Sequence, residues 1–282
     1  MSRGPEVGHF FDFSLTFSLL GYVASAVLSG AILGVVAGVI SPLIVMRNMA
    51  FSVHATAEVA FAGGAAALLI GVDVGYGAIA AAVITALVLG VLSQRSAERD
   101  SVIGVVLTLG LGLGVLCLSL YQGRAGNKFG LLIGQIFATD SGQVTTFAIA
   151  GLAVVVCIAL LYRPLLFASV DPDLAAARGV PTRLLTPAFA VLVGVSSALA
   201  VQLVGSLLVV SLMITPGAAA ARVTASPLRA TLLAVVFAEV AMLGGILLSI
   251  APGLPASAFV TTISFLIYLG CRAVGSTARA VA

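Results

Sequence analysis

A histidine and a glutamate, His54 and Glu58, lie four residues apart inside an apolar stretch over residues 51–72. This spacing puts both side chains on one face of an α-helix. Ionisable side chains at membrane depth are costly to bury, so such a pair indicates a function. Imidazole nitrogen and carboxylate oxygen suit zinc, and also manganese or ferrous iron. The pair therefore predicts a cation site, and with only two ligands the site is open enough to release its ion.

Other interpretations of the intramembrane ionisable side chains stay open. His54 and Glu58 could hydrogen-bond to each other and serve only to hold helices together. Glu239 is the third ionisable side chain well inside an apolar stretch. It could face a transport pathway, or it could pair with a polar group on a neighbouring helix.

The composition excludes an ordinary soluble globular protein. Of the 282 residues, 61% are hydrophobic and 8% are charged, and the mean hydropathy is +1.24. The sequence therefore predicts an all-α, polytopic membrane helix bundle that forms a single transmembrane domain over residues 1–282. The only lysine, Lys128, is not part of a GK[ST] phosphate-binding loop, so we expect no ATP hydrolysis by this chain. Basic residues are scattered singly, so nucleic acid is not an expected partner.

Apolar runs of membrane-spanning length predict nine transmembrane helices. They cover residues 19–46, 53–72, 75–92, 102–121, 144–162, 184–201, 203–221, 228–250 and 258–271. The sixth and seventh runs adjoin, and one unbroken helix through both would be about 57 Å long, nearly twice the thickness of the hydrocarbon core. We therefore expect a break near residues 202–205. A single helix through both runs, which would give eight spans, is the alternative.

The distribution of basic residues favours nine spans and predicts the orientation of the chain. With nine spans, only Arg3, Arg124 and Lys128 fall on one side of the membrane. The other side collects Arg47, Arg95, Arg99, Arg163, Arg178, Arg183, Arg222, Arg229, Arg272 and Arg279. We expect this second side, together with the C-terminus, to be cytoplasmic in a multi-pass protein of the cytoplasmic membrane.

The cytoplasmic loop over residues 163–183 carries the pattern of a short capped helix. An aspartate can cap its start, a proline suits its first position, and a second aspartate suits the positive N-terminal end. An arginine suits the other end and a glycine can terminate the helix. The helix could dock on a partner or lie on the membrane surface. Its candidate docking residues are Asp171, Pro172, Asp173, Leu174, Arg178 and Gly179.

Two further segments differ from a plain membrane helix or turn. Pro216 and Gly217 interrupt the seventh apolar run near its cytoplasmic end. Such residues are tolerated where other groups satisfy the freed backbone, so they predict a gate or, alternatively, a simple kink. The outer loop over residues 122–143 is too short to span, and we expect a re-entrant or surface helix there.

The chain resembles the zinc/manganese family of ABC-transporter permeases over nearly its whole length. Two segments together carry the resemblance: VDPDLAAARGVP over residues 170–181 and VGSLLVVSLMITP over residues 204–216. Met46-Arg47-Asn48-Met49 and the segments at 248–249 and 254–255 add weaker support.

The resemblance implies the membrane subunit of an importer for a divalent cation. Such a permease dimerises in the membrane lipid, binds a separate ATPase subunit through the loop over 163–183, and receives the ion from an extracytoplasmic metal-binding protein. It holds no permanent cofactor, only the transported Zn, Mn or Fe ion. In similar permeases an aspartate followed four residues later by a histidine binds the ion. Here His54 and Glu58 occupy those positions in the reverse order, which leaves the identity of the metal open.

Two other functional classes remain as alternatives. A proton- or cation-coupled secondary transporter could relay protons through His54, Glu58 and Glu239 without any ATPase. An ABC permease for a metal chelate would need a wide cavity and would leave the histidine and glutamate without a clear purpose.

Overall fold

The computed structural model describes residues 24–92, 99–123, 130–131, 134, 136–138, 141–250 and 254–280. This part of the chain is helical and contains no β-strand, which confirms the predicted all-α class. Eight of its segments are long and apolar enough to cross a membrane, and α4 is a shorter apolar helix. The helices are α2 (Ala24–Met46), α3 (Ala50–Ile70), α4 (Val74–Leu92), α5 (Arg99–Leu120), α7 (Ser141–Val170), α8 (Pro172–Ala177), α9 (Thr182–Val204), α10 (Val209–Met213), α11 (Thr215–Val223), α12 (Pro227–Ile250) and α13 (Ala256–Ala280), with 3₁₀ turns η2 (Ile136–Ala138) and η3 (Ser206–Leu208).

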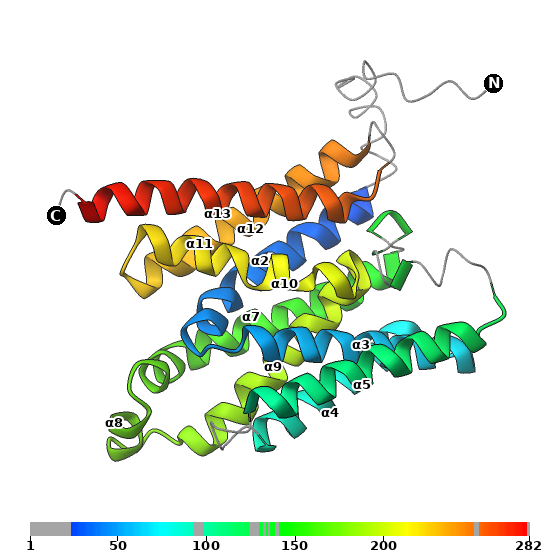
Figure 1. Ribbon diagram of the computed structural model, residues 1–282, viewed down its shortest axis with the longest axis horizontal. Coiled ribbons are helices and arrows are strands. Elements are labelled where there is room, and N and C mark those ends of the chain that lie inside the picture. The colour runs from blue at the N-terminus through cyan, green and yellow to red at the C-terminus, as the bar shows by residue number, and fades with distance from the viewer. Residues whose placement is uncertain are drawn as a thin grey trace.

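The long helices run side by side and form two packed groups (Figure 1). One group consists of α3, α4, α5 and α9, and the other consists of α2, α11, α12 and α13. The helices α7 and α10 contact members of both groups. The short helix α8 and the end of α13 lie at the same end of the bundle, on the left of Figure 1.

Small residues allow these helices to pack at very short distances. A Cβ atom added at Gly63 of α3 would lie 2.4 Å from the carbonyl oxygen of Gly77 in α4, and a Cβ at Gly77 would lie 2.4 Å from that of Gly63. Close backbone contact replaces the hydrophobic effect as the source of helix association inside a membrane. The glycine pair therefore holds α4 against α3, the helix that carries His54 and Glu58.

The sixth and seventh apolar runs are separate segments, as expected. The helix α9 ends at Val204, and Gly205 has φ of +87°, a conformation that side chains with a Cβ rarely adopt. The second segment is itself discontinuous. It consists of η3, then α10, an interruption at Ile214, and finally α11. The break lies where it was predicted, and the Pro216 region begins a new helix.

The helix α7 is longer than the apolar run predicts. The expected span over 144–162 is only part of α7, which continues through Pro164 to Val170. Pro164 lacks an amide hydrogen and so removes one intrahelical hydrogen bond. The following Leu165 is fully buried in the hydrophobic core, and this contact favours continuation of the helix. The loop predicted over 163–183 is therefore shorter, with its first eight residues belonging to α7.

Candidate metal site

His54 and Glu58 project from the first half of α3. Since α3 begins at Ala50, Glu58 lies about 12 Å along the helix at 1.5 Å per residue. Glu58 is only 2% exposed, whereas His54 is partly exposed. A carboxylate buried among apolar helices is expensive unless it is paired or binds a cation.

Both side chains keep polar atoms that bind nothing in the described part of the chain. Nδ1 of His54 and Oε2 of Glu58 are buried and have no hydrogen-bond partner among the described residues. Unused nitrogen and oxygen lone pairs on one helix face are suitable ligands for a divalent cation. The pair is therefore chemically free to bind an ion.

The discontinuous segment after α9 lies against this part of α3. Both η3 and α10 contact α3, and the side chain of Ser206 in η3 lies beside the Glu58 carboxyl group. Ser206 is fully buried, and the carboxyl group of Glu58 is the polar group that its side chain faces. Unwound segments of membrane helices commonly supply ion ligands in transporters. Sequence reasoning missed Ser206, although its place directly after the predicted break was a usable signal.

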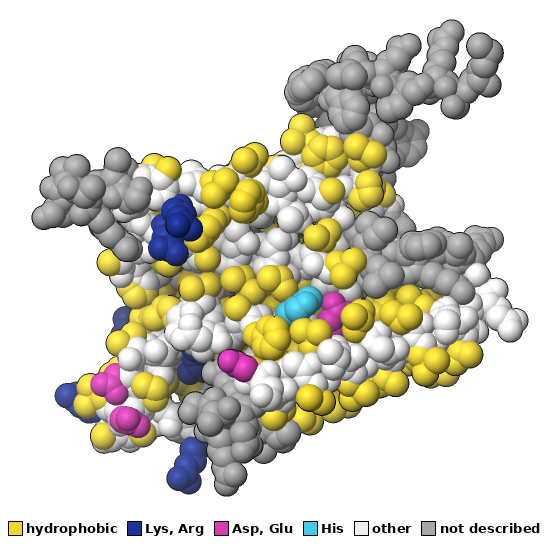
Figure 2. Space-filling model, in the orientation of Figure 1, with side chains coloured by type: hydrophobic (Ala, Val, Ile, Leu, Met, Phe, Trp, Pro, Cys, Tyr) yellow, Lys and Arg dark blue, Asp and Glu magenta, His cyan; other side chains and the backbone are white. Residues whose placement is uncertain are grey.

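The imidazole can be reached from one face of the molecule. Figure 2 shows a histidine side chain at the surface next to an acidic one, among apolar side chains. His54, the only histidine among the described residues, is partly exposed. The imidazole is therefore not sealed inside the described bundle.

Glu239 is not part of the same cluster. Among the described residues no three His, Cys, Asp or Glu side chains come together as a metal site. Glu239 lies on α12 against α2, where a Cβ added at Gly34 would be 2.6 Å from its Oε1. That Oε1 is buried and has no partner in the part of the chain that the structure describes. The structure therefore places Glu239 at a separate helix contact.

The predicted short capped helix is present as α8. Oδ1 of Asp171 accepts a hydrogen bond from the backbone amide of Leu174 at 2.9 Å, and Pro172 occupies the first turn. Arg178 ends the helix and Gly179 follows with φ of +82°. All of these residues are exposed, and only Ala175 of α8 is buried. The helix thus presents its polar face outward and has little contact with the rest of the chain.

Pro216 and Gly217 are both buried at the start of α11, where α11 packs against α2. A Cβ added at Gly217 would lie 2.6 Å from the backbone nitrogen of Pro42. The glycine is therefore required for this helix contact, independent of any gating motion. Part of the outer loop over 122–143 lies outside the described residues; of the rest, Leu131 and Ile136 are buried.

Comparison with known proteins identifies the family to which this chain belongs. A model of the ABC 3 transport family matches residues 20–275. The chain belongs to this family. The permease is 31% identical over 242 residues to the manganese transport system membrane protein MntC of Halalkalibacterium halodurans, covering 86% of this chain and 82% of that relative. It is 30% identical over 178 residues to the manganese import system permease protein ScaB of Streptococcus parasanguinis, covering 63% of each.

The fold is shared with a solved structure. The permease matches a chain of PsaBC from Streptococcus pneumoniae in complex with Fab with a TM-score of 0.83, at 23% identity, covering 92% of this chain and 95% of that chain. These comparisons confirm the resemblance that the sequence segments indicated. The permease is a multi-pass membrane subunit of an ABC transporter, a class of subunit that is not itself an enzyme.

Proposed function

We propose that the permease carries a divalent metal ion inward, with manganese as the first candidate and with His54 and Glu58 as its ligands. The observation that carries the proposal is the pair of unpartnered ligand atoms on α3 beside the helix break. The relatives named as manganese transport proteins support this choice of ion. Zinc and iron remain competing ions because the same ligand types bind them.

The exposed helix α8 supports the docking of an ATPase, and membership of the ABC 3 transport family supports the rest of the proposed assembly. A separate ATPase subunit docks on α8 through Asp171, Pro172, Asp173, Leu174, Arg178 and Gly179, and it supplies ATP hydrolysis. An extracytoplasmic metal-binding protein delivers the ion, and two copies of the permease form a homodimer. In this arrangement α8 and the C-terminus are cytoplasmic, as the distribution of arginines predicts. The whole chain then acts as one transmembrane permease domain.

Metal uptake into proteoliposomes tests the ligand assignment. The permease would be reconstituted with its ATPase and binding protein, and uptake of manganese, zinc and iron would be compared. We expect Glu58→Gln and His54→Ala to lower uptake of the cognate metal about 10-fold or more, as loss of an ion ligand does. Binding of Mn²⁺ to the isolated permease, followed by electron paramagnetic resonance, should weaken in the same variants.

Thr56→Val is the matched control for this experiment. Thr56 lies on α3 between the two ligands, and its hydroxyl only donates to the backbone oxygen of Ser52 at 2.8 Å. Valine keeps its shape, so uptake should stay near the wild-type value. If the ligand variants take up metal as well as Thr56→Val does, the pair serves helix packing and the assignment is wrong.

The same vesicles separate the other functional classes. Uptake that continues with a hydrolysis-deficient ATPase would indicate a secondary transporter, whereas competition by a chelated metal but not by the free ion would indicate a chelate permease. Glu239→Gln tests the proposed role of Glu239 in the pathway. The proposed gate at Pro216 and Gly217 would be tested by the rate of uptake at saturating metal.

A further inference from the structure

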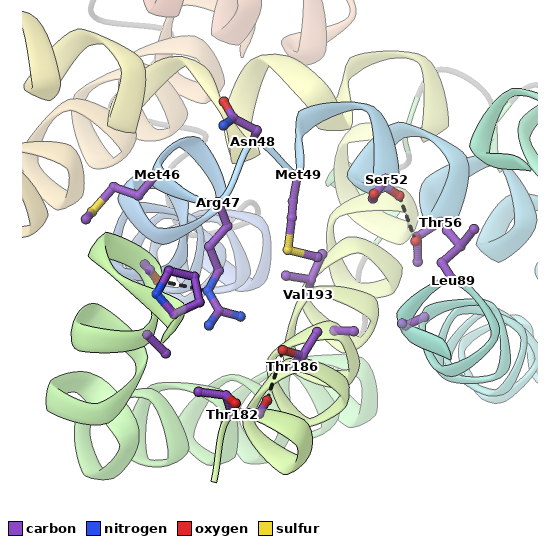
Figure 3. A pocket seen from close by; sticks show the side chains of 16 residues that line it. Met46, Arg47, Asn48, Met49, Ser52, Thr56, Leu89, Thr182, Thr186 and Val193 are labelled. Carbon is purple, nitrogen blue, oxygen red and sulfur yellow. Dashed lines mark hydrogen bonds between the residues drawn. The ribbon is translucent and has the colours of Figure 1, made fainter. Parts of the chain in front are cut away.

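Arg47 occupies the tight turn between α2 and α3 and reaches into a cavity of about 350 Å³. The turn is closed by a hydrogen bond from the amide of Met49 to the carbonyl of Ile44 at 3.0 Å, with Asn48 at φ of +53°. Figure 3 shows the Arg47 side chain extending from this turn into the space between α7 and α9. The cavity therefore lies directly at the start of the helix that carries the metal ligands.

Two contacts hold the guanidinium group in place. Its Nε donates a hydrogen bond to Oγ of Ser169 at 2.8 Å, and its central carbon lies 5.0 Å from the centroid of the Phe189 ring. These contacts use one of five N–H groups and one face of the guanidinium. Among the described residues, the hydrogen bond to Ser169 is the one that the Arg47 side chain makes, so within this part of the chain no group occupies its terminal Nη nitrogens, the fork that binds anions.

The charge of Arg47 is not balanced within the described part of the chain. Burial lowers the pKa of this guanidinium, and no acidic side chain there opposes the effect. Arginine nevertheless stays charged at neutral pH. A partly buried cation is normally accompanied by an anion, because desolvation without a counter-charge is unfavourable.

The remaining lining of the cavity combines hydroxyl and apolar groups. Ser52 and Thr182 contribute hydroxyl groups from α3 and α9, while Met49 and Val193 contribute apolar surface. A hydroxyl donor in the same cavity as a guanidinium complements the oxygens of a phosphate, which a guanidinium binds through two parallel hydrogen bonds. The apolar wall suits the acyl or glycerol part of a lipid.

The cavity lies at the level where the helices end. It is lined by the last residue of α2, Met46, and by the first residues of α8 and α9, Pro172 and Thr182. Ends of apolar spans coincide with the headgroup region of the bilayer, where lipid phosphates are concentrated. Basic pockets between membrane helices at this depth bind anionic headgroups.

We propose that this cavity is a binding site for a phosphate group, held by the terminal nitrogens of Arg47 with the hydroxyl of Thr182. The phosphate belongs either to an anionic lipid headgroup or to a free phosphate ion. When bound, it joins the α2–α3 turn to the start of α9 and so stabilises this end of the bundle. The proposal does not depend on the identity of the transported metal.

Thermal unfolding of the detergent-purified permease tests the site. Inorganic phosphate is compared with chloride at equal ionic strength, and dioleoylphosphatidylglycerol is compared with dioleoylphosphatidylcholine. We expect phosphate or the anionic lipid to raise the Tm by about 2–4 °C in the wild type, as a ligand specific for the folded state does. Arg47→Gln should abolish the shift, and Arg47→Lys should keep only part of it because lysine lacks the planar fork.

Arg183→Gln is the matched control. Arg183 is exposed in the first turn of α9, next to Thr182, and it is not part of the cavity lining. The Arg183→Gln variant loses the same charge as Arg47→Gln at the same end of the bundle, so phosphate or the anionic lipid should still raise its Tm by the full amount. An equal shift in Arg47→Gln and the wild type would overturn the proposal. A shift with phosphatidylglycerol alone identifies the lipid as the source, and a shift with both identifies the phosphate group itself.

Arginine modification keeps the test decisive if Arg47→Gln does not fold. Phenylglyoxal reacts with accessible guanidinium groups, and the peptide containing Arg47 can be followed by mass spectrometry in the wild-type permease. Phosphate or phosphatidylglycerol should slow this modification at Arg47 while leaving Arg183 unchanged. Protection by the ATPase subunit but by neither phosphate source would overturn the proposal and assign the cavity to an acidic side chain of that partner.

Discussion

The hydroxyl of Ser41 in α2 accepts a hydrogen bond from the backbone amide of Gly217 in α11 at 2.8 Å. The same hydroxyl donates to the carbonyl oxygen of Ile214 at 3.2 Å. Membrane helices tolerate proline and glycine where other groups satisfy the freed backbone, and Ser41 does this for the amide of Gly217, whereas the carbonyl of Ile214 also accepts from the amide of Ala218 at 3.0 Å. The hydroxyl of Ser41 in α2 therefore forms hydrogen bonds to the discontinuous segment beside the metal ligands.

Replacement of Ser41 by alanine should destabilise the permease. It would leave the buried amide of Gly217 without its acceptor, which costs about 1–3 kcal/mol. We expect a lower Tm in detergent. Ser119→Ala is the control, because that exposed hydroxyl only donates to Leu116 in its own helix. Equal Tm values for the two variants would show that the Ser41 contact contributes nothing to stability.

Replacement of Gly217 by alanine should push α11 away from α2. The new Cβ would lie 2.6 Å from backbone atoms of Ser41 and Pro42, and overpacking of this kind costs about 1–3 kcal/mol. We expect a lower Tm and a smaller monodisperse fraction in size-exclusion chromatography. Gly270→Ala in α13 is the matched control, since its Cβ would meet no atom within 4 Å. A wild-type profile for Gly217→Ala would contradict this packing.

Exchange of the two ligands tests whether ligand type or position matters. The double variant His54→Glu/Glu58→His keeps one imidazole and one carboxylate at the same spacing on α3. If the ion needs only these two groups on one face, metal uptake should fall by no more than about 10-fold. The double alanine variant, measured in the same vesicles, sets the level without ligands. If metal uptake by the exchanged variant is as low as that of the double alanine variant, position 54 requires the imidazole and position 58 requires the carboxylate.

Loss of the cap of α8 should weaken assembly with the ATPase and leave metal binding intact. Asp171→Ala removes the bond to the amide of Leu174, which costs the short helix about 1 kcal/mol. Since α8 has only one buried residue, little else holds it folded. We expect reduced co-purification of the ATPase and reduced stimulation of its hydrolysis. Asp171→Asn, which can still cap, should behave like the wild type.

A large part of this protein could be predicted from its sequence alone. Uninterrupted apolar runs led to the membrane-spanning helices, because burial of apolar side chains in lipid depends on composition and length more than on packing details. The break after α9 could be predicted from the same length limit. The ends of α8 could be predicted because an aspartate caps a helix through a local hydrogen bond and a glycine readily adopts positive φ, as Asp171 and Gly179 do. The pair His54 and Glu58 was visible because it interrupts an apolar stretch.

The tertiary structure decided which of these features meet. Ser206 lies beside Glu58, and Arg47 bonds to Ser169 at a separation of 122 residues. The separate place of Glu239 against Gly34 is likewise a result of how α12 packs on α2. Helix periodicity tells which residues share a face, but the choice of partner for each face depends on close steric fit between helices that lie far apart in the chain. That fit is a property of the folded bundle and leaves no local pattern in the sequence.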